Sequence, residues 1–185
     1  MEKTERLFIS VDVKITKEIS NILKELKDMG IRPSDEKQIH ITLSFLGDTP
    51  VSKIDRLVDN LRKELSGTER FNVILSGIGG FPNTRRPRVA WIGVSEGKEQ
   101  LTDLSEKVRA AVRNTKLIQD DKRFSPHVTI ARLRDPTDLT EMAERYSSVI
   151  FSEYVVDSVR LMKSVLSPSG AKHSLLASFE LKKQS

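Results

Sequence analysis

The sequence predicts a mixed α/β (α+β) fold in which two lobes enclose a central groove, and three observations lead to this prediction. Residues 40–43 and 127–130 both read His, apolar, Thr, apolar, 87 residues apart. Segments with strand and helix periodicity alternate in a similar order in both halves of the chain, and no linker-like stretch separates the halves. We therefore expect one bilobal domain over 1–185, built from two repeats of about 1–87 and 88–185. Two antiparallel sheets flanked by helices would then be related by a pseudo-twofold axis.

The predicted elements follow from the spacing of apolar residues, which is two along a strand and three or four along one face of a helix. In the first half this spacing predicts strands over 6–13, 38–46, 71–78 and 89–94, and helices over 16–28 and 50–65. The sequence Gly79-Gly80-Phe81-Pro82 is expected to break the third strand. A basic loop over 83–88 precedes the fourth.

The second half repeats this order of elements. The pattern predicts a helix over 98–114, a charged loop over 118–124, a strand over 125–132, a short helix over 136–146 and a strand-rich stretch over 149–166 that bends near Asp157. Turn residues at 167–170 lead into a final strand over 173–181.

The two His-x-Thr-x segments each place an imidazole and a hydroxyl on one face of a strand. Residues i and i+2 of a strand share a face, so His40 and Thr42 point one way, and His127 and Thr129 repeat this. A lone strand histidine is more often structural. Two of the chain's three histidines in matched settings favour a functional pair.

Composition bounds the classes of function. The net charge of +5 favours anionic partners without identifying nucleic acid. The absence of cysteine excludes disulfides, thiolate chemistry and the common cysteine-containing zinc sites. The charged N-terminus does not resemble a secretory signal, and no apolar run approaches the roughly 18 residues of a membrane span. We expect a cytoplasmic protein that does not enter a membrane.

Two facing imidazoles suit general acid–base catalysis, because histidine titrates near pH ~6.5 and can serve as neutral base or protonated acid. In-line displacement at phosphorus needs a base on the attacking side and an acid on the departing side. Thr42 and Thr129 can donate hydrogen bonds to the non-bridging phosphoryl oxygens. This chemistry needs neither metal nor cofactor, and we expect none.

Other chemistries lack the residues they need. No further histidine or carboxylate stands at short ligand spacing from the two motifs. The stretch Gly93–Glu99 resembles a phosphate-binding loop, but it is one residue short and Glu99 replaces the Ser or Thr that binds magnesium. The glycines at 77–80 lack dinucleotide-binding spacing, and no nucleophile elbow supports a serine triad.

The paired motifs, in their contexts His40-Ile-Thr-Leu-Ser-Phe-Leu-Gly47 and Ser125-Pro-His-Val-Thr-Ile-Ala-Arg132, resemble the RNA 2′,3′-cyclic phosphodiesterase (2′-5′ RNA ligase) family of the two-histidine phosphoesterases. The stretch from Leu166 to His173 resembles that family too, with His173 replacing a common aromatic. The resemblance implies a bilobal fold and metal-independent hydrolysis of RNA 2′,3′-cyclic phosphates to 2′-phosphomonoesters. It makes His40 the proton donor to the leaving 3′-oxygen and His127 the proton acceptor that activates water. The residues themselves do not assign these two roles.

Further substrate contacts are expected from four residues. Arg132 matches the family's arginine after the second motif, and Arg85 and Arg123 belong to basic loops that could attract RNA phosphates. Phe45 could stack on a base. Strict alternation, however, turns Phe45 and Arg132 away from the histidines and favours a core position for Phe45. We interpret His173 as a packing residue.

Three functions stay open. The first is hydrolysis of cyclic-phosphate RNA ends, possible substrates being tRNA or its fragments. The second is reversible 2′-5′ ligation at the same site, and the third is an RNA-end binding module without significant catalysis. Intact His and Thr in both motifs argue against the pure binder. We expect a monomer.

Overall fold

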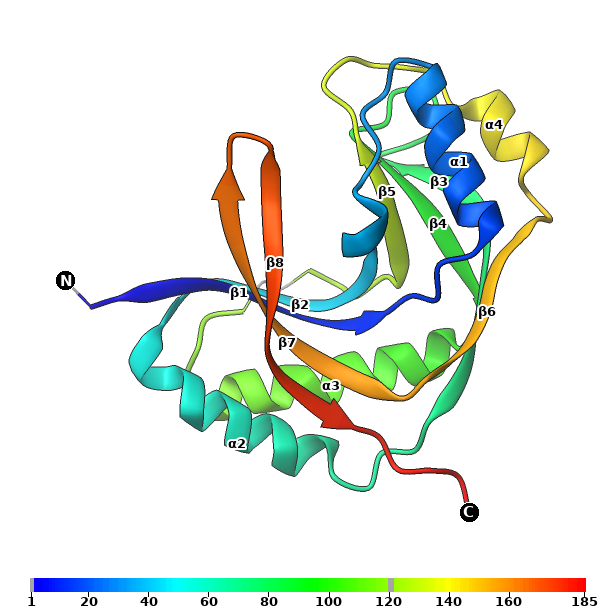
Figure 1. The fold of residues 1–185 in the computed structure, drawn as a ribbon. Helices are drawn as coiled ribbons and strands as arrows, with labels where there is room; N and C mark the ends of the chain where they lie inside the picture. The colour runs from blue at the N-terminus through cyan, green and yellow to red at the C-terminus, as the bar shows by residue number, and fades with distance from the viewer. Residues whose placement is uncertain (1, 120–121) are drawn as a thin grey trace.

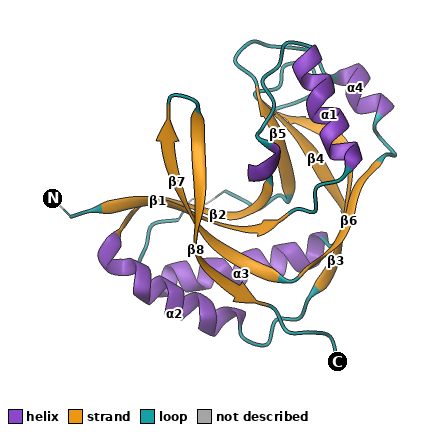
Figure 2. Cartoon of the chain, viewed as in Figure 1, coloured by secondary structure: helices purple, strands orange, loops and turns teal. Residues whose placement is uncertain are grey.

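The computed structural model describes residues 2–119 and 122–185, and over these residues the chain forms four α-helices and one antiparallel sheet of eight strands (Figure 1, Figure 2). The elements are β1 (Thr4–Asp12), α1 (Lys17–Asp28), η1 (Glu36–Gln38), β2 (His40–Pro50), η2 (Val51–Lys53), α2 (Ile54–Leu65), β3 (Phe71–Phe81), β4 (Val89–Glu96), α3 (Lys98–Asn114), β5 (His127–Arg132), α4 (Thr140–Arg145), β6 (Ile150–Val156), β7 (Ser158–Ser167) and β8 (Gly170–Glu180). The mixed α/β class is confirmed. The charged loop predicted over 118–124 includes residues 120 and 121, which lie outside the described residues.

The strand order is β6-β3-β4-β5-β2-β1-β7-β8, with β5 and β2 at the centre. We call the strands β6-β3-β4-β5 the β5 half and β2-β1-β7-β8 the β2 half. The two predicted sheets are therefore halves of one continuous sheet. Within the described residues, Ile41 and Val128 are the one registered pair that joins β2 to β5.

Each half of the sheet contains strands from both halves of the sequence. Strand β3, which precedes residue 87, lies between β6 and β4. Strands β7 and β8, from the end of the chain, extend the β2 half beyond β1. The division into repeats at about residue 87 stays a prediction. Each half of the sheet takes one or more strands from the other side of that division.

Helices cover the two halves in a corresponding way. Helices α2 and α3 pack together, with α3 against β2 and α2 against β8, whereas α1 contacts β6 and α4 contacts β3 (Figure 1). The apolar stripe of α1 is buried, and its N-terminus is capped by the Thr16 hydroxyl, which accepts from the Ile19 backbone N–H. The core includes the apolar residues behind both His-x-Thr-x motifs, namely Ile41, Leu43, Val128 and Ile130.

Strand β3 continues through the glycines that were expected to break it. Gly79 pairs with Trp91 on β4, and a Cβ added at Gly79 would lie 2.2 Å from the Trp91 ring. The glycine therefore gives a neighbouring indole room rather than ending the strand. As a result β3 runs to Phe81, whose ring lies 5.4 Å from that of Trp91.

Candidate active site

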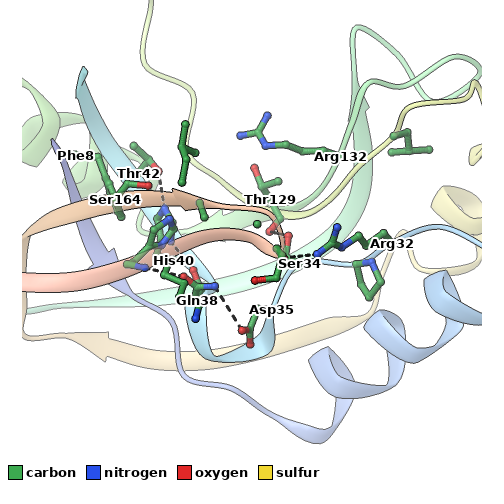
Figure 3. A pocket seen from close by; sticks show the side chains of 18 of the residues that line it. Phe8, Arg32, Ser34, Asp35, Gln38, His40, Thr42, Thr129, Arg132 and Ser164 are labelled. Atoms are coloured by element: carbon green, nitrogen blue, oxygen red, sulfur yellow. Dashed lines mark hydrogen bonds between the residues drawn. The ribbon is translucent and has the colours of Figure 1, made fainter. Parts of the chain in front are cut away.

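A groove of about 1380 Å³ lies where the two halves of the sheet meet, and both His-x-Thr-x motifs line it (Figure 3). His40 and Thr42 come from β2, and His127 and Thr129 from β5. Because Ile41 pairs with Val128, the antiparallel register sets His40 beside Thr129 and Thr42 beside His127 on the groove face. The β7–β8 hairpin and the segment 29–35, which follows α1, form further walls.

The two imidazoles are held in the same way. The Nδ1 of His40 lies 2.6 Å from the Gln38 carbonyl oxygen, and the Nδ1 of His127 lies 2.7 Å from the Ser125 carbonyl oxygen. A carbonyl only accepts, so Nδ1 carries the hydrogen in both rings and Nε2 is the atom that gains or loses a proton. The Nε2 of His40 lies 2.9 Å from the Thr42 hydroxyl oxygen.

An aromatic ring supports each imidazole. His40 stacks on Phe8 with ring centroids 4.9 Å apart, and His127 meets Phe81 edge-on at 5.0 Å. The ring centroid of His173 lies 4.7 Å from that of Phe8 and 5.5 Å from that of His40, so the His173 ring packs against both. His173 also lines the groove.

Burial lowers the pKa of both His40 and His127 below the usual value for histidine. The carbonyl that accepts from each Nδ1 opposes this shift, because it favours the protonated ring. Arg132 lowers the pKa of both imidazoles further, and His40 also feels the positive charges of His173 and His127. An anion in the groove would offset these effects and favour protonation, which suits a phosphodiester substrate.

Both His strands carry a β-bulge at the same place in the motif. In β2, Thr42 pairs with Ser10 and Ser44 with Ile9, so Leu43 is an extra residue. Strand β5 has the same irregularity at Ile130, between the pairs Thr129–Trp91 and Ala131–Ala90. A bulge adds one residue to one strand and so reverses the alternation beyond it.

The bulges correct the alternation argument for Phe45 and Arg132. Each residue stands five positions after the histidine of its motif, and both line the groove. The predicted core position of Phe45 is wrong, because its side chain is 62% exposed. Arg132 likewise lies on the histidine side of β5, as Figure 3 shows.

The basic residues of the groove are largely ones that the motifs did not indicate. Arg85 and Arg123 are not among the described residues that line it. Arg85 lies near Asp138, whose pKa is lowered by hydrogen bonds from Thr140 and, to a lesser degree, by the Arg85 charge. The cations that do line the groove are Arg6, Arg32, Arg132, Arg134 and Lys172. Arg132 and Lys172 belong to stretches that carry the family resemblance, whereas Arg6 and Arg32 come from segments without a motif, and tertiary structure brings all of them together.

Within the described part of the chain, no group of three or more His, Asp or Glu side chains could hold a metal ion. No helix within 2–119 or 122–185 is long and apolar enough to cross a membrane.

The sheet, the helices and the paired imidazoles together define a two-histidine phosphoesterase architecture, and the sequence comparison agrees. The family model of the 2′-5′ RNA ligase superfamily matches residues 16–167. The chain belongs to this superfamily. Among curated relatives, the RNA 2′,3′-cyclic phosphodiesterase of Archaeoglobus fulgidus is 36% identical over 179 residues, or 95% of this chain and 99% of the relative. The protein of the same name from Aquifex aeolicus is 35% identical over 85% of each chain.

Solved structures share the fold. The crystal structure of TT0787 of Thermus thermophilus has a TM-score of 0.77 and 29% identity, covering 97% of this chain and all of that one (100%). The E. coli LigT structure with 3′-AMP has a TM-score of 0.76 over 96% of this chain and 98% of that one, at 22% identity. Because the E. coli LigT structure is only 22% identical to this chain, its similarity is a similarity of fold.

Proposed function

We propose that the groove hydrolyses the 2′,3′-cyclic phosphodiester at an RNA end to a 2′-phosphomonoester by acid–base catalysis, without a metal. Relatives named RNA 2′,3′-cyclic phosphodiesterase support the reaction. The observation that carries the mechanism is the matched anchoring of the two imidazoles, which leaves Nε2 of each ring to move protons in one groove.

In the proposed reaction, His127 acts as the base and His40 as the acid. The Nε2 of His127 takes a proton from water while the water oxygen bonds to phosphorus. The bond between phosphorus and the 3′-oxygen breaks, and the Nε2 of His40 gives its proton to that oxygen. His127 takes up one proton and His40 releases one. After a single turnover His127 is therefore protonated at Nε2 and His40 is not. The opposite assignment is equally compatible with the matched anchoring, so these roles follow the family resemblance.

The hydroxyls and the cations support the phosphoryl group. Thr42 and Thr129 flank the histidines and donate to the non-bridging oxygens, while Arg132 offers a cation beside both rings. Phe45 presents an exposed ring for stacking on a base. Arg85 and Arg123 are weaker candidates, because neither is among the groove residues.

The experiment that tests this function uses purified protein in EDTA with an RNA that ends in a 2′,3′-cyclic phosphate. A product heavier by one water that a phosphatase can dephosphorylate supports hydrolysis. Binding without turnover would support the RNA-end binding module instead. Loss of turnover in EDTA that Mg²⁺ or Zn²⁺ restores would overturn the metal-independent mechanism.

Reversible 2′-5′ ligation is a second candidate, since an RNA 5′-hydroxyl can replace water with the same acid and base. The groove of about 1380 Å³ favours keeping it, because that volume exceeds the roughly 300–1000 Å³ of a small-molecule pocket and could admit two RNA ends. Adding a 5′-hydroxyl RNA to the same assay tests for a joined product. We further propose tRNA or its fragments as substrates and a monomeric protein acting in the cytoplasm.

A further inference from the structure

The segment 31–39, which makes up most of the connection between α1 and β2, is bonded to the second His strand. The Ser34 backbone N–H donates to the Ile130 carbonyl at 2.7 Å, and its hydroxyl donates to the Thr129 carbonyl at 3.2 Å. Pro33 forms an isolated bridge with Ala131. One end of the segment is thereby fixed to β5 immediately beyond His127.

The other end of the segment is fixed by Gln38, which contacts three parts of the site. Its backbone carbonyl accepts from His40 Nδ1 at 2.6 Å. Its side-chain Oε1 accepts from the backbone N–H of His173 on β8 at 2.9 Å, and its Nε2 donates to Asp35 Oδ2 at 3.4 Å. Figure 3 shows Gln38 between Asp35 and His40 at the edge of the groove.

The two carbonyls that orient the imidazoles are restrained by different means. Ser125 precedes Pro126, and a residue before proline is confined to extended conformations, so the carbonyl that holds His127 is fixed locally. Gln38 precedes Ile39, which imposes no such restriction. The backbone N–H of Gln38 donates to the Asp35 carbonyl at 2.9 Å, and the side-chain amide of Gln38, bonded to β8 and to Asp35, adds a second restraint on the Gln38 carbonyl.

We propose that Gln38 is a positioning residue for His40. Its side chain fastens the carbonyl that sets the direction of the His40 ring to the β7–β8 hairpin, so that Nε2 faces the phosphoryl group. The proposal rests on the function proposed above, and it adds a residue that the motifs do not contain. Gln38 itself does not contact the reacting atoms.

The first test replaces Gln38 by methionine, which has similar length but cannot accept the His173 N–H. We expect Gln38→Met to lower kcat on an RNA 2′,3′-cyclic phosphate on the order of tenfold, as for the loss of one hydrogen bond, with a smaller change in KM. Gln184→Met is the matched control, because the Gln184 side chain also bonds to the backbone, at the Arg70 carbonyl, but lies outside the groove. It should leave kcat unchanged.

A double-mutant cycle separates positioning from general damage. If Gln38 acts through His40, Gln38→Met should cost less than about twofold in a His40→Ala background. The full loss in that background, or no loss in the wild-type background, would overturn the proposal.

Two further measurements keep the test decisive. In the pair Gln38→Glu with Asp35→Asn, the donor and acceptor are exchanged while both bonds and the net charge are kept, so kcat should recover relative to Gln38→Met. The imidazole nitrogen NMR shifts of His40 report its tautomer without turnover, and Gln38→Met should raise the fraction protonated at Nε2. If the wild type has no cyclic phosphodiesterase activity, the proposed function fails, and unchanged NMR shifts in Gln38→Met would refute the positioning role independently.

Discussion

His40 and His127 are anchored alike but surrounded differently. Both donate through Nδ1 to a carbonyl two residues earlier, yet His40 lies against Phe8 and near His173, while His127 meets Phe81. The anchoring makes both rings competent to transfer a proton at Nε2. The anchoring is the same for an acid and for a base, so the two roles differ in which proton each ring moves.

The leaving group distinguishes the acid from the base. Replacing either histidine by alanine should lower the rate on cyclic-phosphate RNA by on the order of 10²–10⁴, because one proton transfer is lost. On a nitrophenyl phosphodiester, whose departing oxygen needs no acid, His40→Ala should recover most of its activity and His127→Ala should not. Steady-state rates on both substrates provide the comparison. Rescue of His127→Ala alone would mean that the two roles are reversed.

Two controls accompany this comparison. The double alanine variant should lose far less than the product of the single losses, because the histidines act as a unit. Thr129→Val should cost less than either alanine variant, since it removes one hydrogen-bond donor to phosphate and leaves both proton transfers in place.

The pH dependence follows from the direction of the two pKa shifts. Burial and neighbouring cations disfavour the imidazolium of both His40 and His127, so both pKa values lie below the usual histidine value of about 6.5. In the productive state one of the two imidazoles is protonated at Nε2 and the other is not, and this state is most populated between the two pKa values. A plot of kcat/KM against pH should therefore be a bell centred below about 6.5. A centre above neutrality would show that these shifts do not govern the free enzyme.

The individual strands show where sequence patterns succeed and where they stop. Apolar spacing predicted most strands and helices close to their observed limits, because each buries one face in the core. Alternation failed after Leu43 and Ile130, since a bulge depends on pairing with a neighbouring strand and leaves no mark in local periodicity. Arg132 could therefore be proposed as a groove residue from the family resemblance and Phe45 from its aromatic ring, but alternation placed neither of them correctly.

The close approach of Gly79 and Trp91 gives a prediction at the level of a strand pair. Gly79→Ala would place a methyl group within the space of the Trp91 ring and displace it, at a cost of about 1–3 kcal/mol in the free energy of unfolding. Urea denaturation measures this cost.

The matched control is to make Gly79→Ala in a Trp91→Leu background, where the smaller side chain at position 91 leaves room for the methyl group. In the double variant the added cost of Gly79→Ala should largely disappear. Equal costs in both backgrounds would show that the indole is not the cause. Because Phe81 contacts both Trp91 and His127, the single variant should also lower turnover.

At the scale of the whole molecule, the sequence motifs predicted that two strands would share one groove, and they do. The sequence did not predict that each half of the sheet would contain strands from both halves of the sequence, because this depends on pairing between strands far apart in the chain. Arg6, Arg32 and Lys172 reach the groove by that same assembly, from segments far apart in sequence. Long-range pairing thus supplies much of the positive charge around the two histidines.

The junction of β2 with β5 predicts a local response to ligand. Ile41 and Val128 form the one registered pair there among the described residues, whereas β1 and β2 are registered along most of their length. An RNA ending in a 2′-phosphomonoester would contact both strands, so its binding should slow amide hydrogen exchange at Ile41 and Val128. Exchange at Leu161, which pairs within the β2 half, serves as the control. Equal protection of all three amides would contradict a local effect.

Under the proposed function, the paired bulges would also set how an RNA strand lies in the groove. A site with two equivalent His/Thr pairs would accept a chain in either direction, since turning the substrate end for end would exchange identical partners. The bulges bring Phe45 and Arg132 into equivalent positions beyond the two motifs, and one is an aromatic ring while the other is a cation. A phosphate can pair with Arg132 but not with Phe45, whereas a base can stack on the Phe45 ring. The polarity of the bound strand, and with it which oxygen departs, would then be set by this inequality together with the different surroundings of His40 and His127.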